Sequence, residues 1–215
     1  MLSLSNSTLK LFLECPRCFW LHFNKKISRP RGIFPTLPTG MDSVIKNYFN
    51  QYRSIGEIPP LISGKVEGKL ADISLNLNFV DSDSDLKITG KLDECLVLND
   101  GIYIPLDHKT RSSLPNNVGY SQNYYQTQMD TYTLLLQKNG YATRNQAYIV
   151  YYSPAKGELH KGVPFEVEVH SIPTSPEKAF LLYQSAKSCL EGELPPSSPE
   201  CEFCLWQREV SQFHE

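Results

Sequence analysis

Hydrophobic and polar positions along the chain follow two periods, one typical of helices and one typical of strands. Apolar residues recur at helical spacing over residues 3–24, so we expect a helix there, kinked or broken at Cys15 because Pro16 follows. A Pro-rich loop over residues 29–38 precedes a short amphipathic helix over residues 40–53. The later patterns predict a strand or strand pair (61–80), a polar turn (81–85), a hairpin (86–110), a loop (111–119), a helix (123–140), two strands (146–154 and 165–172) and a final helix (175–192). This order of elements predicts a single α/β domain over residues 1–215.

The predicted hairpin carries candidate chemistry. Residues 99–101 read Asn-Asp-Gly, a turn signal between two strand-forming runs. If the turn centres on position 100, Asp93 faces Asp107, and Lys109 shares their face because it lies two residues further along the strand. Directly opposed residues have Cβ atoms roughly 4.5–5.5 Å apart, and two like charges there destabilise a sheet. A divalent metal bound by carboxylate oxygens would relieve the repulsion, whereas a solvated polar hairpin is the alternative interpretation.

Six cysteines form a second group of candidate residues. Two C-x-x-C pairs, Cys15/Cys18 and Cys201/Cys204, suggest a metal or cluster site, since disulfides are not expected in a reducing compartment. The two pairs lie too far apart for a local zinc finger, so the site would join the two ends of the domain. Cys95 follows the predicted strand pattern and is expected to be a core thiol.

Composition and charge narrow the functional classes. The chain has 215 residues, 40% of them hydrophobic, which is typical of a globular protein. It has no long apolar run and no signal-peptide pattern, so we expect a cytoplasmic protein without a membrane partner. The net charge of −2 gives no global basic signal, and the local stretch at residues 25–31 is either a phosphate contact or a solvated loop. There is no G-x-x-x-x-G-K-[ST] loop, so any helicase motor would be a separate partner protein.

Five sequence features together resemble the PD-(D/E)XK nuclease superfamily, and within it the RecB-type and CRISPR-associated adaptation exonucleases that carry an iron–sulfur cluster. They are the S-x-S-x-L-x-x-F-x-x-C-P pattern at residues 5–16, GKLDE at 90–94, LDHKT at 106–110, the Q-x-x-x-Y pair at Gln128 and Tyr132, and the terminal C-x-x-C. The resemblance implies a restriction-endonuclease-like core with a mixed central sheet flanked by helices. It also implies DNA repair or CRISPR-related DNA processing.

The resemblance assigns roles residue by residue. Asp93 and Asp107 are similar to the acids that bind Mg²⁺ or Mn²⁺, and the backbone carbonyl of His108 would complete the metal shell. Lys109 would orient or deprotonate the attacking water. In the same resemblance, the side chains of Gln128 and Tyr132 would contact the substrate or hold the lysine.

This sequence departs from the family pattern in two places. Asp42 stands where the family usually supplies a histidine to the metal, and it is either a metal ligand or an ordinary acid at a helix N-terminus. The related cluster proteins have a further C-terminal cysteine, so here the fourth ligand would be Cys18 or, as a substitute, Cys189. We favour Cys18, which completes two C-x-x-C pairs. Resemblance favours a [4Fe–4S] cluster, and structural zinc is the alternative.

The sequence thus predicts a metal-dependent DNA nuclease that acts on ends or single strands. The alternatives are an inactive nuclease fold that binds nucleic acid or a partner protein, and a zinc-stabilised scaffold with no role in nucleic-acid chemistry. Three tyrosines near the start of the 123–140 helix, Tyr120, Tyr124 and Tyr125, have the chemistry to stack on bases, although core packing is the usual role of such residues.

Overall fold

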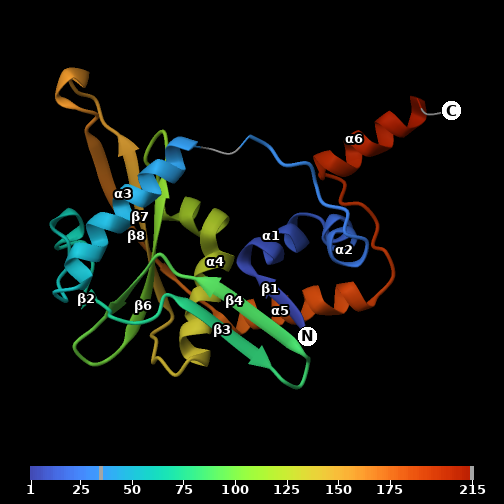
Figure 1. Cartoon of the computed structure of the whole chain (residues 1–215), viewed down its shortest axis with the longest axis horizontal. Helices are drawn as coiled ribbons and strands as arrows, with labels where there is room; N and C mark the ends of the chain where they lie inside the picture. Colours follow the sequence, from blue (N-terminus) through green and yellow to red (C-terminus); the bar gives the residue numbers. More distant parts are fainter. Residues whose placement is uncertain (34–35, 214–215) are drawn as a thin grey trace.

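The computed structural model describes residues 1–33 and 36–213, which form two sheets surrounded by helices (Figure 1). The larger sheet has the strand order β2-β5-β6-β7-β8 and the smaller one β1-β4-β3. The strands are β1 (Leu2–Ser5), β2 (Lys69–Leu70), β3 (Asn76–Asp81), β4 (Leu86–Lys91), β5 (Glu94–Val97), β6 (Tyr103–Thr110), β7 (Gln146–Pro154) and β8 (Phe165–Pro173). The α-helices are α1 (Asn6–Glu14), α2 (Pro16–Asn24), α3 (Thr36–Arg53), α4 (Val118–Lys138), α5 (Pro176–Glu191) and α6 (Glu202–Val210); short 3₁₀ turns are η1 (Pro60–Ile62), η2 (Leu159–Lys161) and η3 (Ser211–Phe213).

Strand β6 is the centre of the larger sheet. It pairs antiparallel with β5 and parallel with β7, so the sheet is mixed as predicted. Residues 104–108 of β6 are all buried, which is typical of a strand covered by other elements on both faces. A side chain in this buried stretch therefore lies inside the molecule, and a charged one needs a specific partner.

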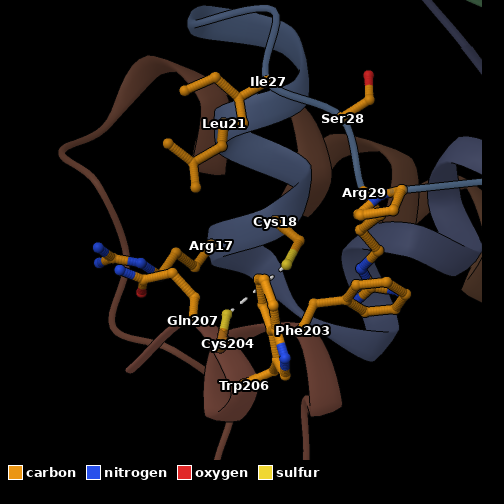
Figure 2. Close-up of a pocket in the computed structure, with 11 residues that line it drawn as sticks. Arg17, Cys18, Leu21, Ile27, Ser28, Arg29, Phe203, Cys204, Trp206 and Gln207 are labelled. Carbon is orange, nitrogen blue, oxygen red and sulfur yellow. Dashed lines mark hydrogen bonds between the residues drawn. The ribbon is translucent and has the colours of Figure 1, made fainter. Parts of the chain in front are cut away.

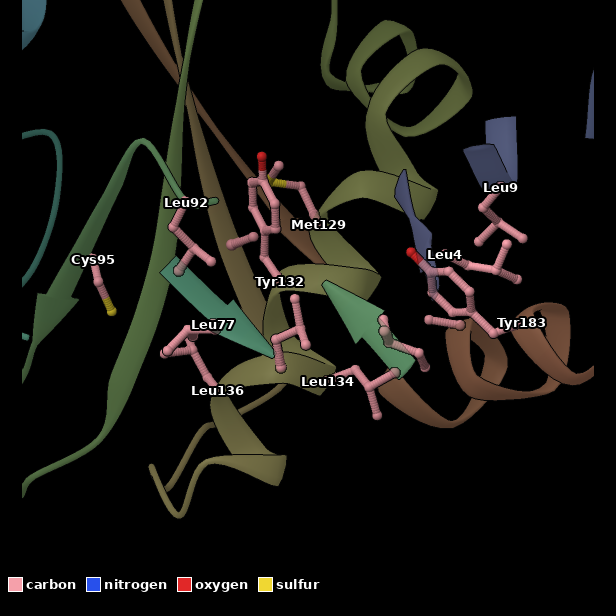
Figure 3. Packing of buried hydrophobic residues seen from close by; sticks show 14 of the residues in the cluster. Leu4, Leu9, Leu77, Leu92, Cys95, Met129, Tyr132, Leu134, Leu136 and Tyr183 are labelled. Carbon is pink, nitrogen blue, oxygen red and sulfur yellow. The ribbon is translucent and has the colours of Figure 1, made fainter. Parts of the chain in front are cut away.

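Helices cover the larger sheet on both faces. Ile45 and Phe49 of α3 pack on one face against apolar residues of β5, β6 and β7. The opposite face packs against α4, whose residues Met129 and Tyr132 share a core with α1, α5 and the smaller sheet (Figure 3). Helix α4 thus lies between the two sheets. Gly90 of β4 permits this close packing, because a Cβ atom there would lie 2.5 Å from a methyl carbon of Leu135.

The predicted hairpin register is confirmed. Glu94 pairs with Leu106 and Val97 with Tyr103, so residues whose numbers sum to 200 face each other. Gly101 in the turn has φ +80°, a conformation that glycine adopts without strain. The prediction of one continuous hairpin over 86–110 was wrong in one respect, because β4 belongs to the smaller sheet and the chain crosses to the larger one at residues 92–93.

Three other predicted elements differ in the structure. The N-terminus begins with a strand rather than a helix: residues 2–5 pair with β4, Leu4 is buried, and Ser5 then caps α1. The break at Cys15 is confirmed. Helix α3 begins at Thr36, inside the predicted Pro-rich loop, because proline is tolerated in a first helical turn; positions 34 and 35 of that loop lie outside the described residues. The tail forms a further helix, α6, that was not predicted.

None of the helices in the described residues is long and apolar enough to cross a membrane.

Candidate active site

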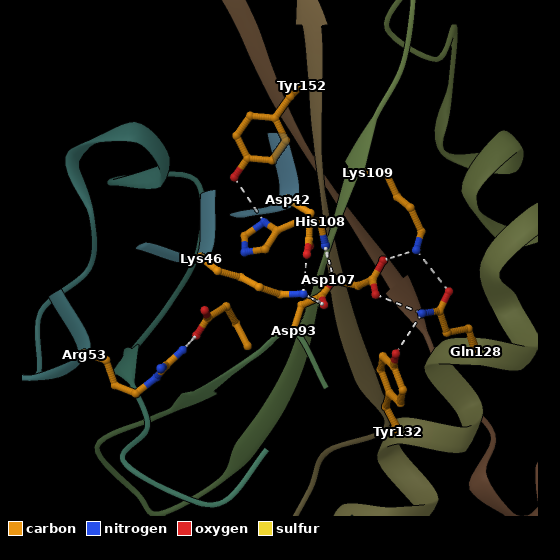
Figure 4. Close-up of polar contacts among 11 residues, drawn as sticks. Asp42, Lys46, Arg53, Asp93, Asp107, His108, Lys109, Gln128, Tyr132 and Tyr152 are labelled. Carbon is orange, nitrogen blue, oxygen red and sulfur yellow. Dashed lines mark hydrogen bonds and ion pairs between the residues drawn. The ribbon is translucent and has the colours of Figure 1, made fainter. Parts of the chain in front are cut away.

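Three elements, β5, β6 and α4, bring the predicted catalytic residues together (Figure 4). Asp93 immediately precedes β5, and Asp107 and Lys109 lie on β6. Gln128 and Tyr132 project from α4, which packs on the same face of the sheet. The site is therefore assembled from the hairpin register and one packed helix.

Gln128 links the lysine to the second acid. Its side-chain amide donates to Asp107 Oδ1 at 2.9 Å, and its carbonyl accepts from Lys109 Nζ at 3.1 Å. The ammonium of Lys109 also forms an ion pair with Asp107 Oδ2. The same Gln128 amide donates to the Tyr132 hydroxyl at 2.8 Å, one helical turn further along α4. The three groups around Asp107 therefore have fixed positions relative to one another.

Asp107 is the most buried acid of the site, with 1% of its side chain exposed. Burial raises the pKa of Asp107 to about 7, since the nearby Lys109 charge offsets only part of the desolvation cost and the Asp93 charge adds to it. Within the described residues, its Oδ2 atom accepts no hydrogen bond and has only the lysine charge beside it. The Lys109 ammonium is thus the cation beside this oxygen, and a metal ion would compete with it for the carboxylate.

Asp93 lies in a different environment. Its Oδ2 accepts the backbone N–H of His108 at 3.2 Å, and its Oδ1 lies 3.4 Å from Lys46 Nζ. Burial alone would raise the pKa of Asp93, but this hydrogen bond and the charges of Lys46 and Lys109 outweigh it and lower the pKa. Two neighbouring carboxyl groups thus have pKa values shifted in opposite directions, an arrangement found where two acids have different tasks.

Lys46 is a residue of the site that the sequence analysis missed. Its ammonium lies 2.7 Å from Asp42 and 3.4 Å from Asp93, and so bridges two of the acids predicted to bind metal. Asp42 and Lys46 are i and i+4 on α3, a spacing visible in the sequence. Because α3 begins at Thr36, Asp42 lies in its second turn rather than its first, so the interpretation of Asp42 as a helix N-terminal acid was wrong.

The His108 side chain points to the opposite face of β6 from Asp107 and Lys109. Its ring packs against Phe49 at a centroid distance of 4.4 Å, and its Nδ1 lies 3.0 Å from the Tyr152 hydroxyl. Burial lowers the pKa of His108 to about 4, so the imidazole is neutral at physiological pH. The predicted role of its backbone carbonyl stays a prediction.

A buried ion pair joins α3 to the residue that follows Asp93. Arg53, at the end of α3, pairs with Glu94, which directly follows Asp93 and is almost fully buried. Burial raises the pKa of Glu94 although Arg53 opposes the shift. The pair ties α3, and with it Asp42 and Lys46, to the edge of the sheet that carries Asp93.

The acids fit a divalent cation in part. Carboxylate oxygens are the ligands that Mg²⁺ and Mn²⁺ prefer, and Asp107 offers a buried oxygen that contacts only the Lys109 ammonium. In the described residues, however, Asp42, Asp93 and Asp107 do not form a compact three-ligand set, since only the cysteines place three or more ligand atoms within 4.8 Å of one another. Lys46 and Lys109 supply the positive charge between the acids instead. A cation here would be held by Asp93 and Asp107, with backbone and water completing its shell.

The four cysteines of the two C-x-x-C pairs form one cluster. Cys15 lies at the break between α1 and α2, Cys18 on α2, and Cys201 and Cys204 at the start of α6. The sulfurs are 3.8 Å apart for Cys15 and Cys204, 3.7 Å for Cys18 and Cys204, and 3.6 Å for Cys18 and Cys201. Cys189 packs beside the main apolar core and lies outside this set, so Cys18 is the fourth member as favoured. Cys95 is a buried core thiol as predicted.

The spacing of the sulfurs tests what the site holds. Thiolates about 2.3 Å from one tetrahedral ion lie roughly 3.8 Å apart, which matches these distances. In a [4Fe–4S] cluster each thiolate binds a different iron, which holds the sulfurs farther apart. Three sulfur pairs have the tetrahedral spacing, and all four ligand atoms lie within 4.8 Å of one another, so the arrangement is compatible with either occupant.

A cation and aromatic rings surround the cysteine cluster (Figure 2). Arg29 Nη2 donates to Cys201 Sγ at 3.4 Å, and its guanidinium lies 4.8 Å from the centre of the Phe203 ring. Burial raises the pKa of Cys15 and Cys18, but hydrogen bonds to the Cys15 sulfur outweigh it and lower the pKa of Cys15 to about 6. Arg29, the residue of the 25–31 basic stretch that lies here, therefore contacts cysteine sulfur and neutralises part of the thiolate charge.

Comparison with known proteins identifies the family. Residues 57–208 match the family model of the PD-(D/E)XK nuclease superfamily, and because the match spans well over half of the chain, the chain belongs to this superfamily. The predicted resemblance is confirmed at that level. Asp93, Asp107 and Lys109 lie inside the matched region, whereas Asp42 and the first cysteine pair precede it.

The chain is also similar to two solved structures. The crystal structure of SSO0001 is 18% identical, with 96% of this chain and 84% of that one covered at a TM-score of 0.48. A phage related exonuclease from Haemophilus somnus 129PT is 10% identical, with 92% and 82% covered at a TM-score of 0.44. No curated protein matches the sequence significantly. At these TM-scores the two structures carry no argument about function.

Proposed function

We propose that the protein is a Mg²⁺- or Mn²⁺-dependent deoxyribonuclease of the RecB-like branch, built as one domain over residues 1–215, that hydrolyses phosphodiester bonds at DNA ends or in single strands. Superfamily membership supports nucleic-acid hydrolysis. One observation carries the assignment to these residues: Gln128 joins Asp107 and Lys109 in a single hydrogen-bonded unit beside Asp93. An acid, a second acid and a lysine fixed together are what metal-assisted hydrolysis requires.

In this proposal Asp93, Asp107 and the His108 carbonyl would hold the metal. When bound, the ion supplies an activated water and neutralises charge on the scissile phosphate. Lys109 orients the attacking water and adds positive charge next to the phosphate. Gln128 keeps the lysine and Asp107 in register, and the Tyr132 hydroxyl fixes the amide of Gln128. Asp42 is proposed as a further ligand of the metal, and the Lys46 ammonium balances its charge.

The cysteine site is proposed to be structural. Three sulfur distances have the tetrahedral spacing of zinc, and the family resemblance supports a [4Fe–4S] cluster; we propose zinc because the distances belong to this chain. Either occupant would join α2 to α6 without contacting the acids on β5 and β6. Helicases and other DNA-processing proteins are proposed as separate partners.

A second candidate function has one observation in its favour. Lys46 bridges Asp42 and Asp93, so a cation of the chain already balances two of the proposed metal ligands. An inactive nuclease fold that binds DNA or a partner protein would retain such a pairing. The intact unit of Asp107, Lys109 and Gln128 argues for the enzyme.

A nuclease assay separates the two functions. End-labelled single- and double-stranded DNA is incubated with the protein and Mg²⁺ or Mn²⁺, beside the variant Lys109→Ala. The matched control is Lys10→Ala, an exposed lysine on α1 remote from β6. We expect metal-dependent cleavage that is lost in Lys109→Ala and kept in Lys10→Ala. DNA binding without cleavage by the folded wild-type protein would establish the binding module instead.

A further inference from the structure

Helix α4 carries a series of polar and aromatic residues that begins at the site and leads outward. Tyr132, Gln128, Tyr124 and Tyr120 follow one another at intervals of four, so each is the helical neighbour of the next. The two inner members belong to the hydrogen-bonded unit around Asp107 (Figure 4). The two outer members take no part in it.

Strand β6 carries a matching series. Asp107, Lys109 and Arg111 follow at intervals of two, which places them on one face of the sheet. Arg111 lies one residue beyond the strand, but its backbone N–H still donates to the Tyr152 carbonyl at 2.9 Å, so the pairing with β7 extends to it. Asp107 is 1% exposed and Lys109 is 21% exposed, so the series leads from the buried acid toward the surface.

The two series face each other. Gln128 bonds Lys109, and the Arg111 guanidinium lies 4.0 Å from the centre of the Tyr120 ring. The Lys109 ammonium also lies 4.8 Å from the centre of the ring of Tyr125, which follows Tyr124 on α4. Cations and aromatic rings thus alternate in a track that begins at Asp107.

The outer end of the track is a stack of two aromatic rings, of which Tyr124 is exposed and Tyr120 is half-buried. Tyr120 and Tyr124 stack with ring centroids 4.4 Å apart and an interplanar angle of 29°. Arg111 contacts Tyr120, and Tyr124 remains 64% exposed. Core packing does not account for a ring this exposed. Aromatic rings backed by arginine bind bases of any sequence, because every base has a π-face.

We propose that Arg111, Tyr120 and Tyr124 form a stacking platform for the bases of an unpaired DNA strand, placed so that the strand's backbone reaches Asp107 and Lys109. The inference rests on the proposed nuclease function and names its substrate as single-stranded. A duplex keeps its bases stacked on one another and offers the platform none.

Binding without cleavage tests the platform. Affinity is measured by fluorescence anisotropy, without Mg²⁺ or Mn²⁺, for a labelled single strand, an abasic strand of the same length and a duplex. We expect Tyr124→Ala to weaken binding of the single strand roughly 5- to 150-fold. Tyr124→Trp should keep the wild-type affinity, and neither change should alter binding of the abasic strand.

The matched control is Tyr141→Ala. Tyr141 pairs with Tyr103 at a centroid distance of 4.8 Å at the opposite end of β6, and its loss should leave all affinities unchanged. Unchanged single-strand affinity in Tyr124→Ala, or an equal loss on the abasic strand, would overturn the platform. A wild-type protein that binds through Tyr124 but never cleaves with metal would keep the platform and overturn the proposed hydrolysis.

Discussion

At the scale of single residues, the site depends on a carboxyl group in an unfavourable position. Asp107 is buried, and one of its oxygens has no hydrogen-bond donor among the described residues. Burial raises the pKa of Asp107 to about 7, while Asp93 beside it has a lowered pKa. In the metal-free protein below pH 7, Asp93 is therefore charged and Asp107 is mainly protonated. A cation bound between the two acids would stabilise both carboxylates, and so would lower the pKa of Asp107 and remove its proton.

This difference predicts how stability changes with pH. The folded-state pKa of Asp107 lies above its ordinary value of 3.8, so the folded protein holds an extra proton between about pH 4 and 7. The stability that this proton provides is present at pH 4 and is lost as the pH rises through 7, on the order of 4 kcal/mol in total. We expect Asp107→Asn to remove this loss, and so to be more stable than wild type at pH 8.

The measurement is urea unfolding of wild type and Asp107→Asn at pH 5 and pH 8, without added Mg²⁺ or Mn²⁺. The difference between the two proteins isolates Asp107, because the other titrating groups are common to both. Addition of Mg²⁺ or Mn²⁺ at pH 8 should stabilise only the wild type. Equal pH dependence in both proteins would show that the Asp107 carboxyl titrates near its ordinary value.

The residues that could be predicted from sequence are those placed by local rules. Asp93, Asp107 and Lys109 follow from one turn and the two-residue period of a strand, and the hairpin register is confirmed. Gln128 and Tyr132 follow from helical spacing, and their contact is confirmed. Their catalytic roles stay predictions. Lys46 was missed, because its contact with Asp93 depends on how α3 packs against the sheet.

At the scale of elements, α3 joins the sheet through apolar packing and one buried ion pair. The pKa of Glu94 is raised although Arg53 lies beside it. The removal of the Glu94 carboxylate from water therefore destabilises its charged form more than Arg53 stabilises it. We therefore expect the pair to hold α3 in one position while adding little net stability. That position is what brings Asp42 and Lys46 to Asp93.

Three variants test this interpretation of the pair. Arg53→Ala leaves a buried carboxylate without its cation and should lower the free energy of unfolding by about 3–5 kcal/mol. The double change Arg53→Met with Glu94→Leu should restore or exceed wild-type stability. Arg144→Ala, which breaks the exposed pair with Glu67, is the control and should cost less than about 1 kcal/mol. A double variant as unstable as Arg53→Ala would show that the ion pair itself stabilises the fold.

Elements with a long, regular pattern could be predicted, and those defined by their partners could not. Helix α4, helix α5 and strands β7 and β8 have strong periodicity, and the structure contains all four. Strand β1 exists because it pairs with β4, a partner some 80 residues later, and strand β2 has only two residues. Helix α6 begins directly after Cys201, where the cysteine cluster fixes the chain. These elements take their conformation from contacts distant in the sequence.

At the scale of the whole molecule, the cysteine cluster joins the two ends of the described chain. Cys18 and Cys201 are 183 positions apart, and their sulfurs lie 3.6 Å from each other. Helix α6 has no buried residue of its own, so apolar packing contributes little to its position (Figure 1). A bound ion would therefore supply most of the energy that holds α6 against α2, and that energy would count toward folding.

The cluster predicts both a metal content and a loss of stability. The sulfur spacing fits one tetrahedral ion, so purified protein should contain about one zinc per chain by elemental analysis and lack the visible absorbance of iron–sulfur proteins. Cys201→Ser should lose the metal, lower the melting temperature and make α6 sensitive to proteolysis. Cys189→Ser, which alters a cysteine outside the cluster, is the control and should keep the metal. Iron in fourfold excess over the chain, in anaerobically purified protein, would identify a [4Fe–4S] cluster and require the four sulfurs to lie farther apart than they do in this structure.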